Sequence, residues 1–74
     1  MEVYTVIRYE FANNKLIYSG TNKELAYKKL HSHRYNGLHT WVDDQEISYR
    51  TKGFYQEYEY RNGKKKVVKE EKNS

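Results

Sequence analysis

A single helix constrains what this chain can fold into, because only the stretch from Ser19 to Gly37 has a helical pattern. Within it, Leu25, Ala26 and Leu30 fall on one arc at about 100° per residue and form a narrow apolar face. A helix of roughly a dozen residues is marginal in water unless that face is covered. The rest of the chain must therefore form a sheet against which this helix packs.

Residue signals mark both ends of this helix. Thr21 and Glu24 have the spacing of a capping box, which predicts Thr21 as the N-cap. His33 and Arg34 would occupy the last turn, where the helix carbonyls favour positive charge. Asn36–Gly37 then predicts a left-handed stop at the C-terminal end.

The N-terminal residues predict a hairpin. A strand is expected from Glu2 to Ala12, with one side made up of Val3, Thr5, Ile7, Tyr9 and Phe11. Asn13–Asn14 predicts a two-residue turn, because asparagine tolerates positive φ. This turn would place Phe11 opposite Leu16. It would also place Tyr9 opposite Tyr18, which gives the hairpin one continuous apolar side. We expect the helix to dock on that side.

After the helix, alternation predicts two further strands, Leu38–Asp43 and Glu46–Thr51. Either side of these strands could face inward. We favour Leu38 and Val42 as inward residues, accompanied by Ile47 and Tyr49 of the next strand. That choice would leave Trp41 on the outer side.

The strongest hairpin signal lies near the C-terminus, where Phe54–Arg61 and Lys64–Glu70 flank Asn62–Gly63. Its register would place Tyr58 opposite Val67, Tyr60 opposite Lys65 and Glu59 opposite Lys66. The full element order is β-β-α-β-β-β-β. It predicts an α+β fold, one small domain over residues 1–71 with an antiparallel sheet and one helix on one face, followed by a frayed tail over residues 72–74.

Composition narrows the class of protein. The chain has 74 residues, which is one domain, and no cysteine, which excludes a disulfide or a thiolate metal site within it. A chain of this length buries only about 60% of its unfolded surface, so a homodimer stays among the expected states. Charges interrupt every N-terminal window and no apolar run approaches a membrane span. We therefore expect a cytoplasmic protein without membrane contact.

The positive charge is concentrated at one end of the chain. Residues 1–60 carry eight Lys/Arg and eight Asp/Glu, whereas residues 61–74 carry six Lys/Arg and two Glu, which gives the net charge of +4. The sequence therefore describes a neutral domain with a basic end.

Neither metal binding nor catalysis is indicated. Three histidines, His31, His33 and His39, fall within nine residues, but His31 and His33 would lie about 200° apart on a helix and could not share an ion. Zinc needs three or four convergent ligands, and no Asp or Glu falls at a motif spacing. The carboxylates at residues 43–46 fit a turn for backbone reasons. No nucleophile elbow, phosphate loop or zinc motif occurs. A domain this small is also expected to lack a ligand-burying pocket of ~300 Å³. We expect no enzyme, no metal and no cofactor.

Binding residues are expected on the last hairpin. Its tip combines basic and aromatic side chains, and Trp41 would add an apolar anchor; the candidate residues are Trp41, Tyr55, Tyr58, Tyr60, Arg61, Lys64, Lys65 and Lys66. Aromatic and Arg side chains are typical of protein–protein interfaces. Basic residues beside aromatic rings are also typical of nucleic-acid binding, although nearby glutamates would repel phosphate. Both classes of partner remain open.

The Cys-free compact domain, the Asn/Lys/Tyr-rich composition and the strand-rich ends around Gly20-Thr-Asn-Lys-Glu-Leu-Ala resemble a known group of proteins. These are the small host-takeover proteins that large phages of Gram-positive bacteria make early in infection. The resemblance extends over the whole chain through composition rather than a motif, so it assigns no residue a role.

The resemblance implies a non-enzymatic protein that binds and inhibits a host protein complex in the bacterial cytoplasm. The implied targets are the replication sliding clamp, RNA polymerase, a nucleoid protein or a protease chaperone. The neutral body and basic end differ from the acidic surface that a DNA mimic needs. The alternative expectation is a small nucleic-acid-binding protein that uses the same C-terminal hairpin.

Overall fold

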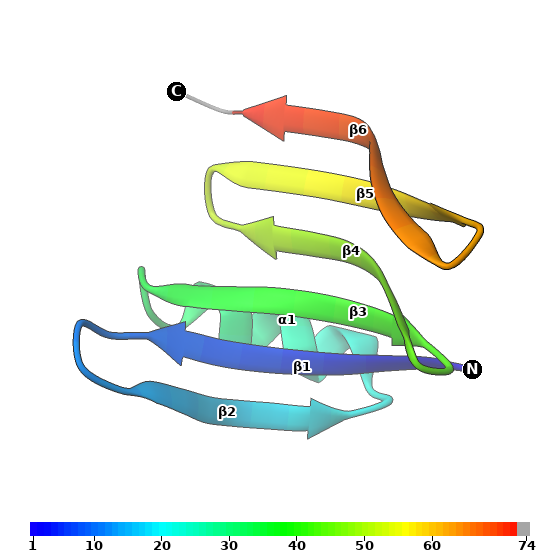
Figure 1. Ribbon diagram of the computed structural model, residues 1–74. Coiled ribbons are helices and arrows are strands. Elements are labelled where there is room, and N and C mark those ends of the chain that lie inside the picture. The colour runs from blue at the N-terminus through cyan, green and yellow to red at the C-terminus, as the bar shows by residue number, and fades with distance from the viewer. Residues whose placement is uncertain (73–74) are drawn as a thin grey trace.

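The computed structural model describes residues 1–72 and confirms the α+β fold, with one helix on one face of an antiparallel sheet (Figure 1). The elements in chain order are β1 (Glu2–Tyr9), β2 (Asn14–Gly20), α1 (Lys23–His31), β3 (Asn36–Val42), β4 (Gln45–Thr51), β5 (Phe54–Arg61) and β6 (Lys64–Lys72). None of the helices in the described residues is long and apolar enough to cross a membrane.

The sheet has six strands in the order β2-β1-β3-β4-β5-β6. Hairpins connect β1 to β2, β3 to β4, β4 to β5 and β5 to β6. The helix α1 carries the chain from β2 across β1 to β3. Because this crossover spans only the first half of the sheet, α1 lies over β1 and β3 and leaves β4, β5 and β6 without a helix (Figure 1).

The core lies between α1 and the side of the sheet that carries Tyr4 and Val6. Ala26 and Leu30 of the helix are buried against Tyr4, Val6 and Leu38. The prediction that the helix would dock on the side of Val3, Thr5 and Ile7 is therefore wrong. The reason is the pairing of β1 with β3: Val6 lies directly opposite Leu38, so an inward Leu38 requires an inward Val6.

The first hairpin also departs from its predicted register. β1 ends at Tyr9, and the turn is closed by the amide of Glu10, which donates to the carbonyl of Asn13 over 3.3 Å. As a result Tyr9 lies opposite Asn14 rather than Tyr18. Phe11 belongs to the turn and is fully exposed instead of facing Leu16.

The helix is shorter than predicted, and its ends use other residues. Its N-cap is Asn22 rather than Thr21, and the Asn22 side chain accepts from the Leu25 amide over 3.0 Å. Asn36 forms no left-handed stop. It begins β3, is buried, and donates from Nδ2 to the carbonyl of Lys29 over 2.8 Å, so it ties the end of the helix to the sheet. His33 and Arg34 lie beyond the helix.

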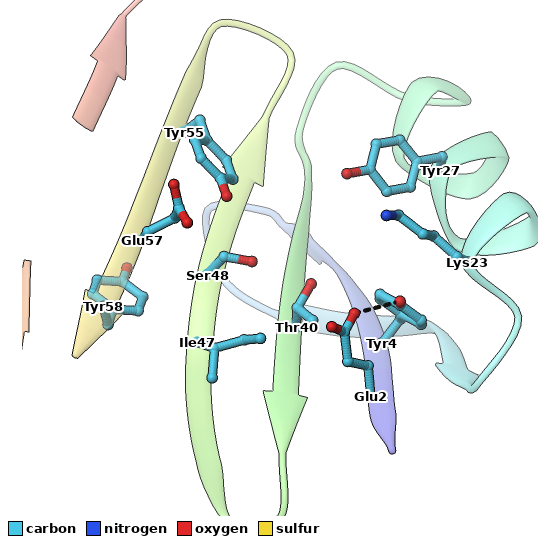
Figure 2. Close-up of a pocket in the computed structure, with 10 residues that line it drawn as sticks. All are labelled: Glu2, Tyr4, Lys23, Tyr27, Thr40, Ile47, Ser48, Tyr55, Glu57 and Tyr58. Carbon is cyan, nitrogen blue, oxygen red and sulfur yellow. Dashed lines mark hydrogen bonds between the residues drawn. The ribbon is translucent and has the colours of Figure 1, made fainter. Parts of the chain in front are cut away.

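The side chains of β3 and β4 agree with the prediction in part. Leu38 faces inward and Trp41 lies on the outer side. β4 carries one extra residue, Ile47, because Thr40 pairs with Ser48 while Trp41 pairs with Glu46. Ile47 lines the helix side, as expected (Figure 2). Tyr49, opposite His39, lies on the outer side, so its predicted inward position is wrong.

The structure confirms the turn and the register predicted for the C-terminal hairpin. Asn62 and Gly63 have φ of 53° and 75°, as a two-residue turn of this type requires. The three predicted pairs are all present: Tyr58 with Val67, Tyr60 with Lys65 and Glu59 with Lys66. β6 continues to Lys72, one residue into the predicted tail, whose other residues lie outside the described part of the chain.

Candidate binding surface

The helix-free side of the sheet carries a continuous group of aromatic side chains, which we call the aromatic face. It consists of Tyr9 from β1, His39 and Trp41 from β3, Tyr49 from β4, and Phe54, Tyr58 and Tyr60 from β5. Strand alternation explains the arrangement, because His39 and Trp41 alternate with the inward residues Leu38 and Thr40. Figure 1 views the sheet from this side, with α1 behind it.

A chain of polar contacts crosses the centre of the aromatic face. The Tyr9 hydroxyl hydrogen-bonds the Nε2 atom of His39, and His39 Nδ1 lies 2.5 Å from an oxygen of Glu46. The other oxygen of Glu46 accepts from Lys65 Nζ over 3.3 Å. Lys65 also lies 4.5 Å from the ring centre of Tyr58. Five strands, β1 and β3 to β6, are thereby joined by side chains across one surface.

Ring contacts and hydrogen bonds hold the remaining side chains of the aromatic face, and the Tyr60 hydroxyl donates to the carbonyl of Glu46 over 2.9 Å. His39 and Tyr49 have ring centres 4.7 Å apart, and Tyr49 and Phe54 are 6.3 Å apart. The indole Nε1 of Trp41 donates to Thr5 Oγ1 over 3.0 Å. The rings are therefore held in place while each keeps part of its surface in solvent, and Tyr9 is the most open at 37%.

Three phenols of the aromatic face have a raised pKa. Burial is the main cause that raises the pKa of Tyr9, Tyr49 and Tyr58, and the negative charge of Glu46 raises each pKa further. At neutral pH these hydroxyls are therefore hydrogen-bond donors and acceptors without charge. With Glu46 paired to His39 and Lys65, the aromatic face presents rings and hydroxyls with little uncompensated charge.

Strand alternation divides the predicted binding residues between two sides of the sheet. Trp41, Tyr58, Tyr60 and Lys65 belong to the aromatic face or border it. Tyr55, Arg61, Lys64 and Lys66 lie on the helix side, because their positions alternate with those residues along β5 and β6. The eight residues therefore do not form one site.

The sequence reasoning missed several residues of the aromatic face. Tyr9 and Tyr49 were expected to face inward. His39 was considered only as a metal ligand, and Glu46 only as a turn carboxylate. One signal was available: His39 lies two residues before Trp41, so an outer Trp41 implies an outer His39 in the same strand.

A polar groove occupies the helix side of the sheet, between α1 and β5 (Figure 2). Its volume is about 300 Å³, and it is lined by Glu2, Tyr4, Lys23, Tyr27, Thr40, Ile47, Ser48, Tyr55 and Glu57. Tyr58 borders it as well, but its hydroxyl donates to Gln56 on the side of the aromatic face. The sequence predicted no pocket of this size. The groove exists because α1 covers only the first half of the sheet, so its flank stands above uncovered strands.

Within this groove, the hydroxyl of Tyr4 donates to Glu2 Oε1 over 2.7 Å. This hydrogen bond, with burial as the second cause, raises the pKa of Tyr4 to about 12. Arg50 lies 4.2 Å from the ring centre of Tyr55 and 5.6 Å from that of Tyr27, two residues that line the groove. Arg50 thus links the helix to β5 through cation–π contacts.

Most cations of the C-terminal hairpin are paired with carboxylates. Arg61 contacts Glu59, Lys69 contacts Glu57 and Glu71, and Lys72 contacts Glu70, at distances between 3.3 and 3.9 Å. Lys65 contacts Glu46. Within residues 1–72, Lys64 and Lys66 are the hairpin cations without such a partner. The basic excess seen in the sequence is therefore largely compensated locally.

The described residues contain no group of three or more His, Cys, Asp or Glu side chains that could hold a metal ion. His39 and Glu46 provide only two such groups. Comparison of the chain with protein-family models, with curated proteins and with solved structures finds no match.

Proposed function

We propose that this chain is a non-enzymatic binding module that binds a protein partner through the aromatic face. The observation that carries the proposal is the uncovered side of the sheet, where seven rings are held by ring contacts or hydrogen bonds and remain partly exposed. Tyrosine and tryptophan held in one conformation are the side chains that supply most binding energy at protein interfaces, because little side-chain entropy is lost on binding.

The charge arrangement favours a protein over a nucleic acid as partner. A nucleic acid would need cations beside the rings on which its bases stack. Among the described residues, the hairpin cations on that side are Lys65 and Lys72, which lie opposite Tyr60 and Phe54. Lys65 is engaged by Glu46 and by the ring of Tyr58, and Lys72 is paired with Glu70. Lys64 and Lys66 point to the opposite side, so a strand stacked on the rings would lie across the sheet from them. Nucleic-acid binding is therefore the second candidate.

The resemblance to phage host-takeover proteins supplies the class of partner. In this proposal the partner is a host protein complex of a bacterium, such as a sliding clamp, RNA polymerase, a nucleoid protein or a protease chaperone, and binding inhibits it. The surface chemistry suits a partner patch that is mainly apolar and offers hydrogen-bond acceptors to tyrosine hydroxyls. A strongly basic channel is a poor match, because the aromatic face carries no excess of negative charge.

Affinity capture from a bacterial lysate tests the proposal. The tagged chain is incubated with and without nuclease and washed at low salt and at about 0.5 M salt, which screens exposed charges. We expect one host protein to be retained under all conditions. Loss of every partner on nuclease treatment would contradict the proposal and favour the nucleic-acid alternative.

Matched variants of one strand locate the binding side. Tyr58→Ala removes a ring of the aromatic face, and Tyr55→Ala removes a ring from the helix side; both residues are half-buried tyrosines of β5. We expect Tyr58→Ala to lose the partner and Tyr55→Ala to keep it. Equal loss in both variants, or loss only in Tyr55→Ala, would contradict the assignment of the aromatic face.

A further inference from the structure

β6 is an edge strand with an unusual distribution of side chains. All nine of its residues are exposed, and only one of its edges is paired, to β5. Val67 and Val68 at its centre are exposed to 46% and 48%. The charged residues differ about this centre: Lys64–Lys66 come before the valines, and Lys69, Glu70, Glu71 and Lys72 come after them, so both glutamates lie in the second half. The edge at β2 has no such division, since Lys15 is its one charged residue.

Because of this order of charges, two copies of β6 lying antiparallel to each other can place lysines of one strand opposite glutamates of the other. A second β6 running in the opposite direction can bring its two glutamates opposite Lys64 and Lys65 of the first strand, with the valines meeting at the centre. Opposite charges directly across a strand pair stabilise it, and like charges destabilise it. An edge that served only to prevent pairing would carry charge at its centre rather than two exposed valines.

A bulge in β6 makes this pairing geometrically consistent. Val67 pairs with Tyr58 and Lys69 pairs with Glu57, so Val68 is an extra residue. In a regular strand, residues five apart such as Lys65 and Glu70 lie on opposite sides. The extra residue places both on the side of the aromatic face, opposite Tyr60 and Gln56 respectively.

The same extra residue places Lys64 and Glu71 together on the helix side, since they lie opposite Arg61 and Tyr55. A self-pairing in which Lys65 faces Glu70 of the second copy also sets Lys64 against Glu71. In that register both residues of each pair lie on one side of the sheet. A slip by one residue would place lysine and glutamate on opposite sides and lose the match.

We propose that β6 pairs with β6 of a second copy of this chain, antiparallel and centred on Val67 and Val68. The two-fold axis joins two six-stranded sheets into one and produces Lys64–Glu71 and Lys65–Glu70 contacts twice each. The contact of Lys66 with Lys69 of the second copy is a cost, reduced because Lys69 is already held by Glu57 and Glu71. Both aromatic faces then lie on the same side of the joined sheet. This dimer is independent of the partner proposed above.

Cysteine pairing tests the register directly, because the chain has no cysteine of its own. Lys64→Cys and Glu71→Cys chains are mixed and oxidised. Directly opposite residues of an antiparallel pair have Cα atoms about 4.5–5.5 Å apart, within disulfide range. The matched control mixes Lys64→Cys with Glu70→Cys, whose side chains would lie on opposite sides of the joined sheet.

We expect the first mixture to form the mixed disulfide at least about tenfold faster than the control, because only its thiols meet on one side. We also expect sedimentation equilibrium of the unmodified chain to approach twice its mass of 9.0 kDa as concentration rises from micromolar to millimolar. A monomer over the whole range, or equal crosslinking in the two mixtures, would overturn the proposal.

Charge reversal provides a second readout at the same two positions. Lys64→Glu alone and Glu71→Lys alone each place like charges across the joint and should weaken the dimer about tenfold. An equal mixture of the two variants restores opposite charges at both contacts and should recover the unmodified affinity as a heterodimer. Failure of the mixture to recover would contradict the pairing even if each variant folds normally.

Discussion

Because the core lies on the Tyr4/Val6 side of β1, we predict that Val6→Ala lowers the free energy of unfolding more than Ile7→Ala does, although isoleucine is the larger side chain. Val6 is fully buried beneath the helix, whereas Ile7 is half-buried on the helix-free side. Val6→Ala removes two carbons, each contributing about 0.8 kcal/mol, and leaves a cavity, so we expect a loss of about 2 kcal/mol. Ile7→Ala removes three carbons but from a partly solvated site, and we expect about 1 kcal/mol.

These losses are large enough to measure. A domain of 74 residues at about 0.05–0.15 kcal/mol per residue has a free energy of unfolding of roughly 4–11 kcal/mol. Urea unfolding followed by far-ultraviolet circular dichroism should give a lower midpoint for Val6→Ala than for Ile7→Ala, with the slope unchanged. If Ile7→Ala were the more destabilising of the two, the helix would cover the other side of the sheet and this fold would be wrong.

Three further predictions concern single side chains. Because the pKa of Tyr4 is raised to about 12, the stability it contributes is fully present below pH 10 and is lost as pH rises toward 12. Tyr4→Phe should therefore flatten the fall of the urea midpoint over that range, and an unchanged slope would contradict the hydrogen bond to Glu2. Gly63→Ala should cost about 1 kcal/mol in urea unfolding, since φ is 75° and no atom lies near the added carbon; no loss would contradict the turn geometry. Asn36→Ala should cost about 2 kcal/mol in the same assay, because it removes a buried amide that donates to Lys29; a neutral effect would show that this bond does not hold the helix end.

The C-terminal hairpin, the element order and the fold class could be predicted from the sequence, because each depends on residues that are close together in the chain. Asn62–Gly63 can adopt positive φ at both turn positions, and a two-residue loop allows only one register, so the pairs along β5 and β6 follow. The element order and the α+β class follow in the same way from alternation and from one helical pattern. These features depend on residues close together in the chain.

The choice of the inward side could not be predicted, because it depends on a contact between distant residues. Both sides of β1 are apolar enough to pack, and the pairing of Val6 with Leu38 across 32 positions decides between them (38 − 6 = 32). The predicted register of the first hairpin was wrong for a related reason. Its turn uses four residues, Glu10 to Asn13, rather than the two asparagines, so every pair along β1 and β2 shifts.

The candidate site was predicted only in part, because it depends on the register between β3 and β4. The extra residue Ile47 shifts Glu46 into line with Trp41 and brings its carboxylate within 2.5 Å of His39. Bulges carry no clear signal in a single sequence, so neither this contact nor the link to Lys65 was visible. Residue type alone identified Trp41, Tyr58 and Tyr60 as interface candidates.

The most direct test of the proposed function uses the single tryptophan, which lies on the aromatic face. The chain is labelled with ¹⁵N, and the indole Nε1–H signal of Trp41 is recorded while the captured host protein is added. We expect this signal to shift or broaden together with amides of Tyr9, Tyr49 and Tyr58. An unmoved indole signal with changes confined to Lys64 and Lys66 would place binding on the other side of the sheet and contradict the role proposed for the aromatic face.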